Sequence, residues 1–164
     1  MSERSDASVE DIIDYHAVLI REYFADEVSQ IYFGDVGIYP PSAFQNRIGE
    51  QRIAVSLQID SLKPVPRMQD LAGGLWDLHL NIVPMANMVP EFQALPEAAF
   101  AERRILAFTT RYAHLLMQTE LSTLHGRVTT SAVEGIDYEY MNRGDLAVRG
   151  AAIQWRGQVY INAD

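Results

Sequence analysis

The stretch 52-RIAVSLQIDSLKPVPRMQDLAGGLWDLHLNIV-83 decides the fold class. At both of its ends, apolar residues occupy every second position: Ile53, Val55, Leu57 and Ile59 at the start, and Trp76, Leu78, Leu80 and Ile82 at the end. This alternation predicts two β-strands, each with one buried face. We expect the strands to pair antiparallel, because the segment between them has no helical pattern.

The connecting segment, about 61–74, is predicted to be an extended loop. It contains four residues that break regular structure: Pro64, Pro66, Gly73 and Gly74. The segment is much longer than a hairpin turn needs, and in a compact domain such an extension is usually functional or docks on something. Its basic residues, Lys63 and Arg67, are therefore candidates for contacts with a partner.

Two other segments have helical periodicity. The first, about Ser8–Phe24, carries apolar residues three and four positions apart, and its early acidic residues suit the positive end of a helix dipole. The second, about Pro96–His125, starts with proline at the first helical position and is followed by Gly126. At about 1.5 Å per residue, this second helix is long enough to span a whole sheet.

The remaining strand-like segments complete an α+β pattern. They are Val28–Phe33, Arg127–Val133, Gly135–Met141 and Asp145–Ile161. A mostly antiparallel sheet packed against a long helix and an N-terminal helix is therefore predicted, as a single domain over residues 1–164. No glycine-rich phosphate loop follows a strand, which argues against a nucleotide-binding doubly wound fold.

The last of these strands, 145-DLAVRGAAIQWRGQVYI-161, changes phase along its length. Leu146 and Val148 are apolar at even positions, whereas Ile153, Trp155, Val159 and Ile161 are apolar at odd ones. One extra residue or a bend would return the apolar face to the same side of the sheet. We therefore expect a bulge near Gly150, with two packing surfaces served by the two halves.

A second extended loop is predicted at about 34–50, where glycines and prolines forbid regular structure. It is too apolar for a solvated tether, so it must dock on its own domain or on a neighbour. Tyr39 and Phe44 are its candidate interface residues.

Composition limits the function classes. The 164 residues include no cysteine, so disulfides and thiolate metal sites are excluded. The net charge of −9 argues against broad binding to DNA or anionic lipid. Neither a signal-peptide pattern nor a run of roughly 20 apolar residues is present, so no association with a membrane is expected.

The polar residues do not assemble into a recognisable catalytic or metal-binding motif. The histidines at 16, 79, 114 and 125 lack metal-ligand spacing, and a polar trio of Asp77, His79 and Asn81 is explained as well by a solvated strand face. The same holds for the acidic residues around Glu139. We expect no catalytic residue, no metal and no cofactor, and hence no enzyme.

The exposed arginines of the long helix are better candidates for protein contacts. Arg104 and Arg111 are seven residues apart and so lie on one side of the helix. Guanidinium groups form bidentate ion pairs across interfaces, and on an acidic chain the natural partner is another acidic surface, including a second copy.

Taken as a whole, the order of elements resembles that of the tail terminator (tail completion, or neck) proteins of tailed bacteriophages. The resemblance rests on the N-terminal amphipathic helix, the strand pair RIAVSLQID and LWDLHLNIV, the long helix ERRILAFTTRYAHLLMQTELSTLH, and the closing strands DYEYMNRGDLAVRGAAIQWRGQVYI. The match is one of element order, chain length and apolar pattern, without a signature motif.

The resemblance implies a structural virion protein, assembled in the host cytoplasm. It would form a ring, typically hexameric, that caps the tail tube, stops its polymerisation and joins it to the head connector, with a sheath as a possible further partner. DNA would pass through the ring without specific binding.

Two alternatives accompany this expectation. One is another neck or tail component, such as a head–tail joining protein or a tube subunit. The other is a small α+β enzyme or ligand-binding module with a pocket between sheet and helix, using His79 and Asp77 or the Glu139 face.

Overall fold

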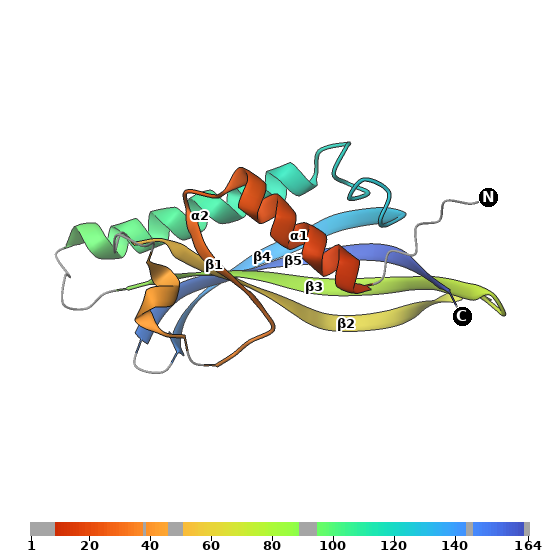
Figure 1. The fold of residues 1–164 in the computed structure, drawn as a ribbon, viewed down its shortest axis with the longest axis horizontal. Helices are drawn as coiled ribbons and strands as arrows, with labels where there is room; N and C mark the ends of the chain where they lie inside the picture. Colours follow the sequence, from red (N-terminus) through yellow and green to blue (C-terminus); the bar gives the residue numbers. More distant parts are fainter. Residues whose placement is uncertain (1–8, 38, 46–50, 89–94, 144–145, 163–164) are drawn as a thin grey trace.

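The computed structural model describes residues 9–37, 39–45, 51–88, 95–143 and 146–162. It confirms the α+β class: a five-stranded sheet in the order β1-β2-β3-β5-β4 carries two α-helices on one face (Figure 1). Strand β1 runs parallel to β2, and the other neighbours are antiparallel. The elements are α1 Val9–Tyr23, β1 Val28–Phe33, the 3-10 helix η1 Pro41–Phe44, β2 Ile53–Asp70, β3 Gly73–Asn87, α2 Leu95–Leu116, β4 Thr130–Arg143 and β5 Leu146–Asn162.

The main core lies between the helices and the sheet. The apolar stripe of α1 contributes Ile12 and Ile20, and α2 contributes Phe108, all of them fully or almost fully buried. The odd positions of β5, including Ile153 and Trp155, project into the same core. The predicted periodicities of 3.6 and 2 therefore point the expected faces at each other.

A second, smaller core covers the opposite face of the sheet at one end. Tyr39, Ala43 and Phe44, from the segment around η1, pack there on Ala54, Val83, Met85 and Val148. This packing explains the phase change of β5, because its even position Val148 serves the second core while its odd positions serve the main core. The loop at 34–50 thus docks on its own chain, at least over the part that the structure describes; residues 46–50 lie outside it.

The predicted bulge near Gly150 is wrong. Strand β5 keeps one register with β3, from Gly73 opposite Asn162 to Asn87 opposite Val148. The irregularity lies instead in the neighbouring strand, between Val133 and Gly135 of β4. An apolar pattern that changes phase can therefore arise without an extra residue, when each face of a strand is covered in turn.

Strand β4 also corrects the expected pair of strands at Arg127–Val133 and Gly135–Met141. The irregularity at Glu134 does not end the strand, which pairs with β5 on both sides of it. A bulge absorbs one unpaired residue while the ladder continues, so one strand replaces the two.

Helix α2 is shorter than predicted, because it ends at Leu116 and not at His125. A series of turns follows, in which Leu124, His125 and Gly126 adopt positive φ angles of 47°, 52° and 87°. Leu121 and Leu124 nevertheless remain in the main core. The apolar spacing that suggested a longer helix belongs to turns that fold back onto the sheet.

Segment 61–74 is a hairpin and not the predicted extended loop. Strands β2 and β3 continue through it to a turn at Leu71 and Ala72. The register shifts between Ile59 and Ser61 and between Pro64 and Gln69, which shows where the prolines are accommodated. Proline is tolerated there because β2 has no described partner on its outer side beyond β1.

Gly73 is required at the end of this turn. Its φ of 144° is a conformation that side chains disfavour, and a Cβ there would lie 2.3 Å from the carbonyl oxygen of Ile161. We expect Gly73→Ala to lower the free energy of unfolding by about 1–3 kcal/mol, as measured by urea denaturation. Ala72→Ser, at the neighbouring exposed position, should change it by less than about 0.5 kcal/mol; equal effects would contradict this interpretation.

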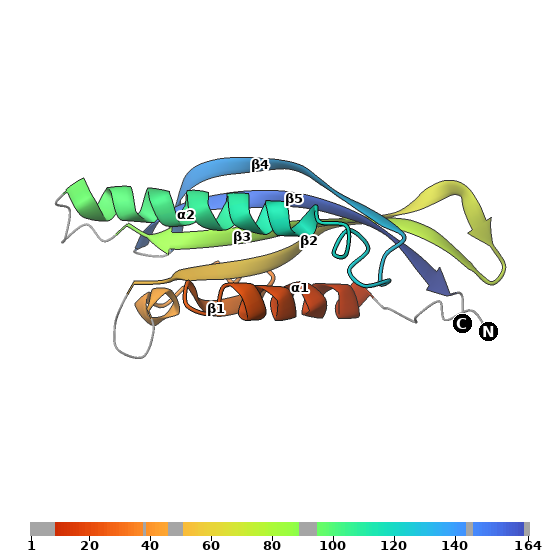
Figure 2. The ribbon, with the colours of Figure 1, turned by 90° about the horizontal axis from the view of Figure 1, so that it is seen from above.

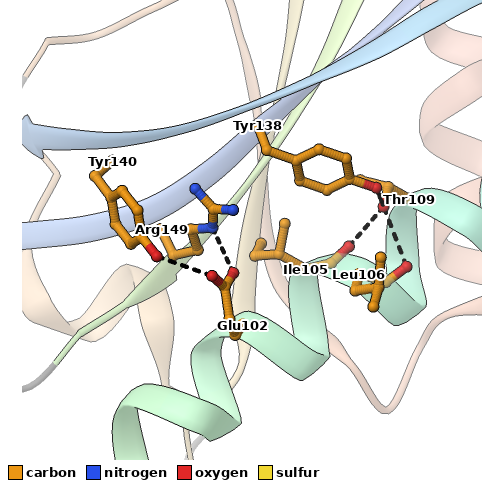
Figure 3. Close-up of polar contacts among 7 residues, drawn as sticks. All are labelled: Glu102, Ile105, Leu106, Thr109, Tyr138, Tyr140 and Arg149. Atoms are coloured by element: carbon orange, nitrogen blue, oxygen red, sulfur yellow. Dashed lines mark hydrogen bonds and ion pairs between the residues drawn. The ribbon is translucent and has the colours of Figure 1, made fainter.

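A polar cluster ties α2 to the outer strand of the sheet (Figure 3). The Glu102 carboxylate accepts hydrogen bonds from the Tyr140 hydroxyl at 2.8 Å and from Nε of Arg149 at 2.5 Å. About two turns later along α2, the hydroxyls of Thr109 and Tyr138 are 2.8 Å apart. These contacts fix the helix over β4 and β5, so its opposite side faces the junction of α1 and β1.

Candidate functional site

The hairpin tip, residues 65–72, is the most exposed part of the sheet. It extends past both helices at one end of the molecule (Figure 2). Leu71 is fully exposed and Met68 is 55% exposed. The turn itself is well held, because the Asp70 carboxylate accepts hydrogen bonds from the backbone N–H groups of Ala72 at 2.8 Å and Gly73 at 3.1 Å. The tip therefore presents apolar side chains on an ordered turn.

A hollow of about 600 Å³ lies between the tip and the turns that follow α2. Its lining includes Arg67, Met68, Arg127 and Tyr160. The Arg127 guanidinium stacks on the ring of Tyr15 at 3.9 Å, which anchors this wall to α1. The hollow thus separates the tip from the helical layer and leaves Leu71 on the outer side.

A second surface, which we call the arginine groove, lies between α2 and the junction of α1 with β1. It has a volume of about 460 Å³, and its lining residues are Phe24, Asp26, Glu27, Arg52, Ile53, Arg103, Arg104, Ala107, Phe108 and Arg111. The floor is apolar, because Phe24, Ile53 and Phe108 supply it. Four of the chain's thirteen Lys and Arg residues gather here, on a protein of net charge −9.

The groove is held in shape by contacts within its wall. Arg111 Nη1 lies 3.1 Å from Glu27 Oε1, and its guanidinium lies 4.9 Å from the centre of the Phe24 ring. The Phe24 and Phe108 rings meet edge to face with centroids 4.8 Å apart. The ion pair between Arg111 and Glu27 is exposed and contributes at most about 1 kcal/mol to stability. It therefore orders the rim of the groove more than it stabilises the fold.

The arginine groove and the hairpin tip lie at opposite ends of one strand. Ile53, which starts β2, lines the groove, and Asp70, which ends β2, belongs to the tip. At a rise of about 3.3 Å per residue, the two are roughly 50 Å apart. The two surfaces cannot meet within one chain.

The structure separates the predicted interface residues into three groups. Arg104 and Arg111 come together in the groove, as their spacing predicts. Arg67 lies in the tip, and Lys63 lies farther down β2, opposite Asp77 of β3. Tyr39 and Phe44 are 2% and 0% exposed and belong to the second core, so they lie inside the protomer.

Sequence reasoning missed three components of these surfaces. Arg52 and Glu27 lie far from α2 in the chain and reach the groove only through the fold, so no local pattern marks them. Leu71 did carry a signal, because a large apolar residue between Asp70 and Ala72 is unusual in a turn.

The candidate residues of the enzyme alternative gather differently from the prediction. His79 Nδ1 lies 3.2 Å from a carboxylate oxygen of Glu134 rather than beside Asp77. This pair borders a shallow hollow of about 290 Å³ with Asp60, Asn81 and Gln154. Asp137 accepts a hydrogen bond from Gln154 at 2.7 Å. Among the described lining residues there is no hydroxyl or amine nucleophile that His79 could activate.

A buried polar pair lies in the main core. Nδ1 of His16 is 2.7 Å from the hydroxyl of Tyr112, and both side chains are fully buried. Burial lowers the pKa of His16 from 6.5 to about 3 and raises that of Tyr112 well above 10. At neutral pH both are uncharged, so the pair is a structural element of the core.

Within the part of the chain that the structure describes, no cluster of three or more potential ligands is placed to hold a metal ion. No described helix is both long enough and apolar enough to cross a bilayer.

The candidate site is therefore a pair of unlike surfaces, one projecting and one recessed. No known protein-family model matches the chain, and no curated protein matches it in sequence.

Proposed function

We propose that this protein is a structural subunit of a homo-oligomeric ring of the tail-terminator type. In that role it would cap a tail tube, stop its polymerisation and join it to the head connector. The proposal combines the resemblance in element order with the two unlike surfaces of the fold.

The observation that carries the proposal is the hairpin tip. A fully exposed leucine on an ordered, projecting turn gives the monomer no stability. Burying a leucine side chain contributes about 1.5–3 kcal/mol, so the tip gains its value only when another molecule covers it. Ile59 and Leu62, nearer the start of β2, are further exposed apolar residues of the same strand.

The position of the surfaces favours a ring. Contacts between two different patches of identical subunits are heterologous, and they form a closed ring when the rotation between neighbours closes. A projecting tip at one end and a groove at the other are two such patches. The net charge of −9 also suits a channel that DNA must cross without being retained.

Light scattering coupled to size-exclusion chromatography tests the proposal over about 1 to 100 μM protein. We expect an assembly of about 111 kDa, six times the chain mass of 18.5 kDa. Negative-stain microscopy of that peak should show a ring with a central channel. A monomer over the whole concentration range, or a compact dimer without a channel, would contradict the proposal.

A further inference from the structure

We infer that the hairpin tip of one subunit seats in the arginine groove of the next copy of the chain. This inference rests on the proposed function and specifies how the ring is held together. Leu71 would enter the groove, and Asp70 would face its basic rim.

The tip is prepared for such a contact. Its turn is fixed by the hydrogen bonds to the Asp70 carboxylate, so little conformational freedom is lost when it binds. Because these bonds use only Oδ1, the other carboxylate oxygen of Asp70 can still accept. Leu71 and Met68 provide the apolar part of the contact.

The groove offers the matching chemistry. Leu71 finds an apolar floor in Phe24, Ile53 and Phe108, and the small, exposed Ala107 also lines the groove. Arg103 is exposed on the rim, where it can bind the Asp70 carboxylate. An apolar anchor beside an acid is thus matched by an apolar floor beside a guanidinium.

The occupant must come from another chain, because the tip and the groove of one subunit are roughly 50 Å apart along β2. A second copy of the chain supplies the required tip, because every copy contains both surfaces. Each copy then gives its tip to one neighbour and receives the tip of the other, which is the arrangement of a ring and not of a two-fold dimer.

Cysteine cross-linking tests this seating directly, because the chain contains no cysteine of its own. We expect a mixture of the single variants Leu71→Cys and Ala107→Cys to form a disulfide-linked dimer under mild oxidation. Neither variant alone should do so. The matched control replaces Ala107→Cys with Leu106→Cys, because Leu106 is exposed on the same helix but does not line the groove; little cross-link is expected there.

The outcomes separate this inference from the proposed function. If the protein assembles but Leu71→Cys and Ala107→Cys do not cross-link preferentially, the tip-in-groove contact is overturned and the proposed ring is not. A cross-link of Leu71→Cys with itself means that two tips meet, which also overturns it. If Ala107→Cys forms a disulfide with Glu139→Cys in preference to Leu71→Cys, the groove binds strand β4 of the neighbouring copy and not its tip, which also overturns the inference. A monomer under all conditions overturns both.

A substitution in the intact chain gives a second measurement. We expect Leu71→Asp to weaken association about 10- to 100-fold by light scattering or sedimentation. Leu106→Asp, at an exposed leucine outside the groove, should change the association constant by less than about threefold. Circular dichroism should be unchanged in both, because both positions are exposed. Equal weakening by the two variants would overturn the assignment of Leu71.

Discussion

Replacing Phe44 with alanine is expected to lower the free energy of unfolding by about 3–5 kcal/mol, the usual range for a buried aromatic side chain. Phe44 is completely buried in the second core, where its ring lies 6.3 Å from that of Tyr39. Removing the ring leaves a cavity that Met85 and Val148 cannot fill without moving strands. The effect should be measured by urea denaturation of the isolated chain.

The matched control for Phe44→Ala is Val36→Ala. Val36 belongs to the same segment but is 52% exposed, so its loss should change stability by less than about 0.5 kcal/mol. The comparison separates an internal role from an interface role. A Phe44→Ala protein of normal stability that fails to assemble would instead make Phe44 an intersubunit residue.

Acidification is expected to destabilise the protein through His16. Burial lowers the pKa of this histidine from 6.5 to about 3 in the folded chain. Between these two values the unfolded chain binds a proton that the folded chain does not bind. The stability that the folded chain gains from keeping His16 neutral is therefore present above about pH 6.5 and is lost as the pH falls toward 3. The loss in the free energy of unfolding is about 3 kcal/mol between pH 7 and pH 4.

The variant His16→Gln tests this pH dependence. Glutamine does not titrate, and its amide oxygen can still accept a hydrogen bond from Tyr112. We expect it to lower stability at pH 7 by about 1–2 kcal/mol and to reduce the further loss between pH 7 and pH 4 by about 3 kcal/mol. His114→Gln, at an exposed position of α2, should retain the pH dependence of the original chain. If His16→Gln retains it as well, His16 is not its source.

The strands were predictable where burial decides the sequence. Most of the alternating apolar residues lie in the main core: Ile53, Val55, Leu57, Leu78, Leu80 and Ile82. Ile59 is an exception, because it is 52% exposed. The expectation of one buried face is wrong for Ala54 and Val83, which pack in the second core on the opposite face of the sheet. The prediction was wrong where strand pairing continued without burial. Pro64 and Pro66 indicated a loop, yet they lie in the part of β2 beyond its pairing with β1, where the register with β3 also shifts and proline is tolerated.

The helix end and the phase of β5 were mispredicted for a different reason. In both places an apolar residue was assigned to the nearest regular pattern, although tertiary packing decided its position. Leu124 continues the helical spacing but reaches the core from a turn. Val148 interrupts the strand pattern because a separate segment, ending at Phe44, covers the other face of the sheet.

The candidate surfaces were predictable only in part. Arg104 and Arg111 share a helix face, so their proximity follows from spacing alone. Arg52 and Glu27 join them through contacts between elements far apart in the chain, which no local rule provides. Tyr39 and Phe44 were predicted as interface residues, yet they pack inside their own chain. A sequence pattern predicts that an apolar loop must dock, but it does not predict whether the loop docks on its own chain or on a neighbour.

The unbroken register between β5 and β3 also determines how the subunit would bear a load. Strand β5 is hydrogen-bonded to β3 on one side and to β4 on the other over most of its length. A pull applied at the tip along the strand direction would be shared among many hydrogen bonds at once, in shear. Opening the sheet from its side would break them one after another. A contact made through the tip therefore acts on the sheet along its mechanically stiffest direction.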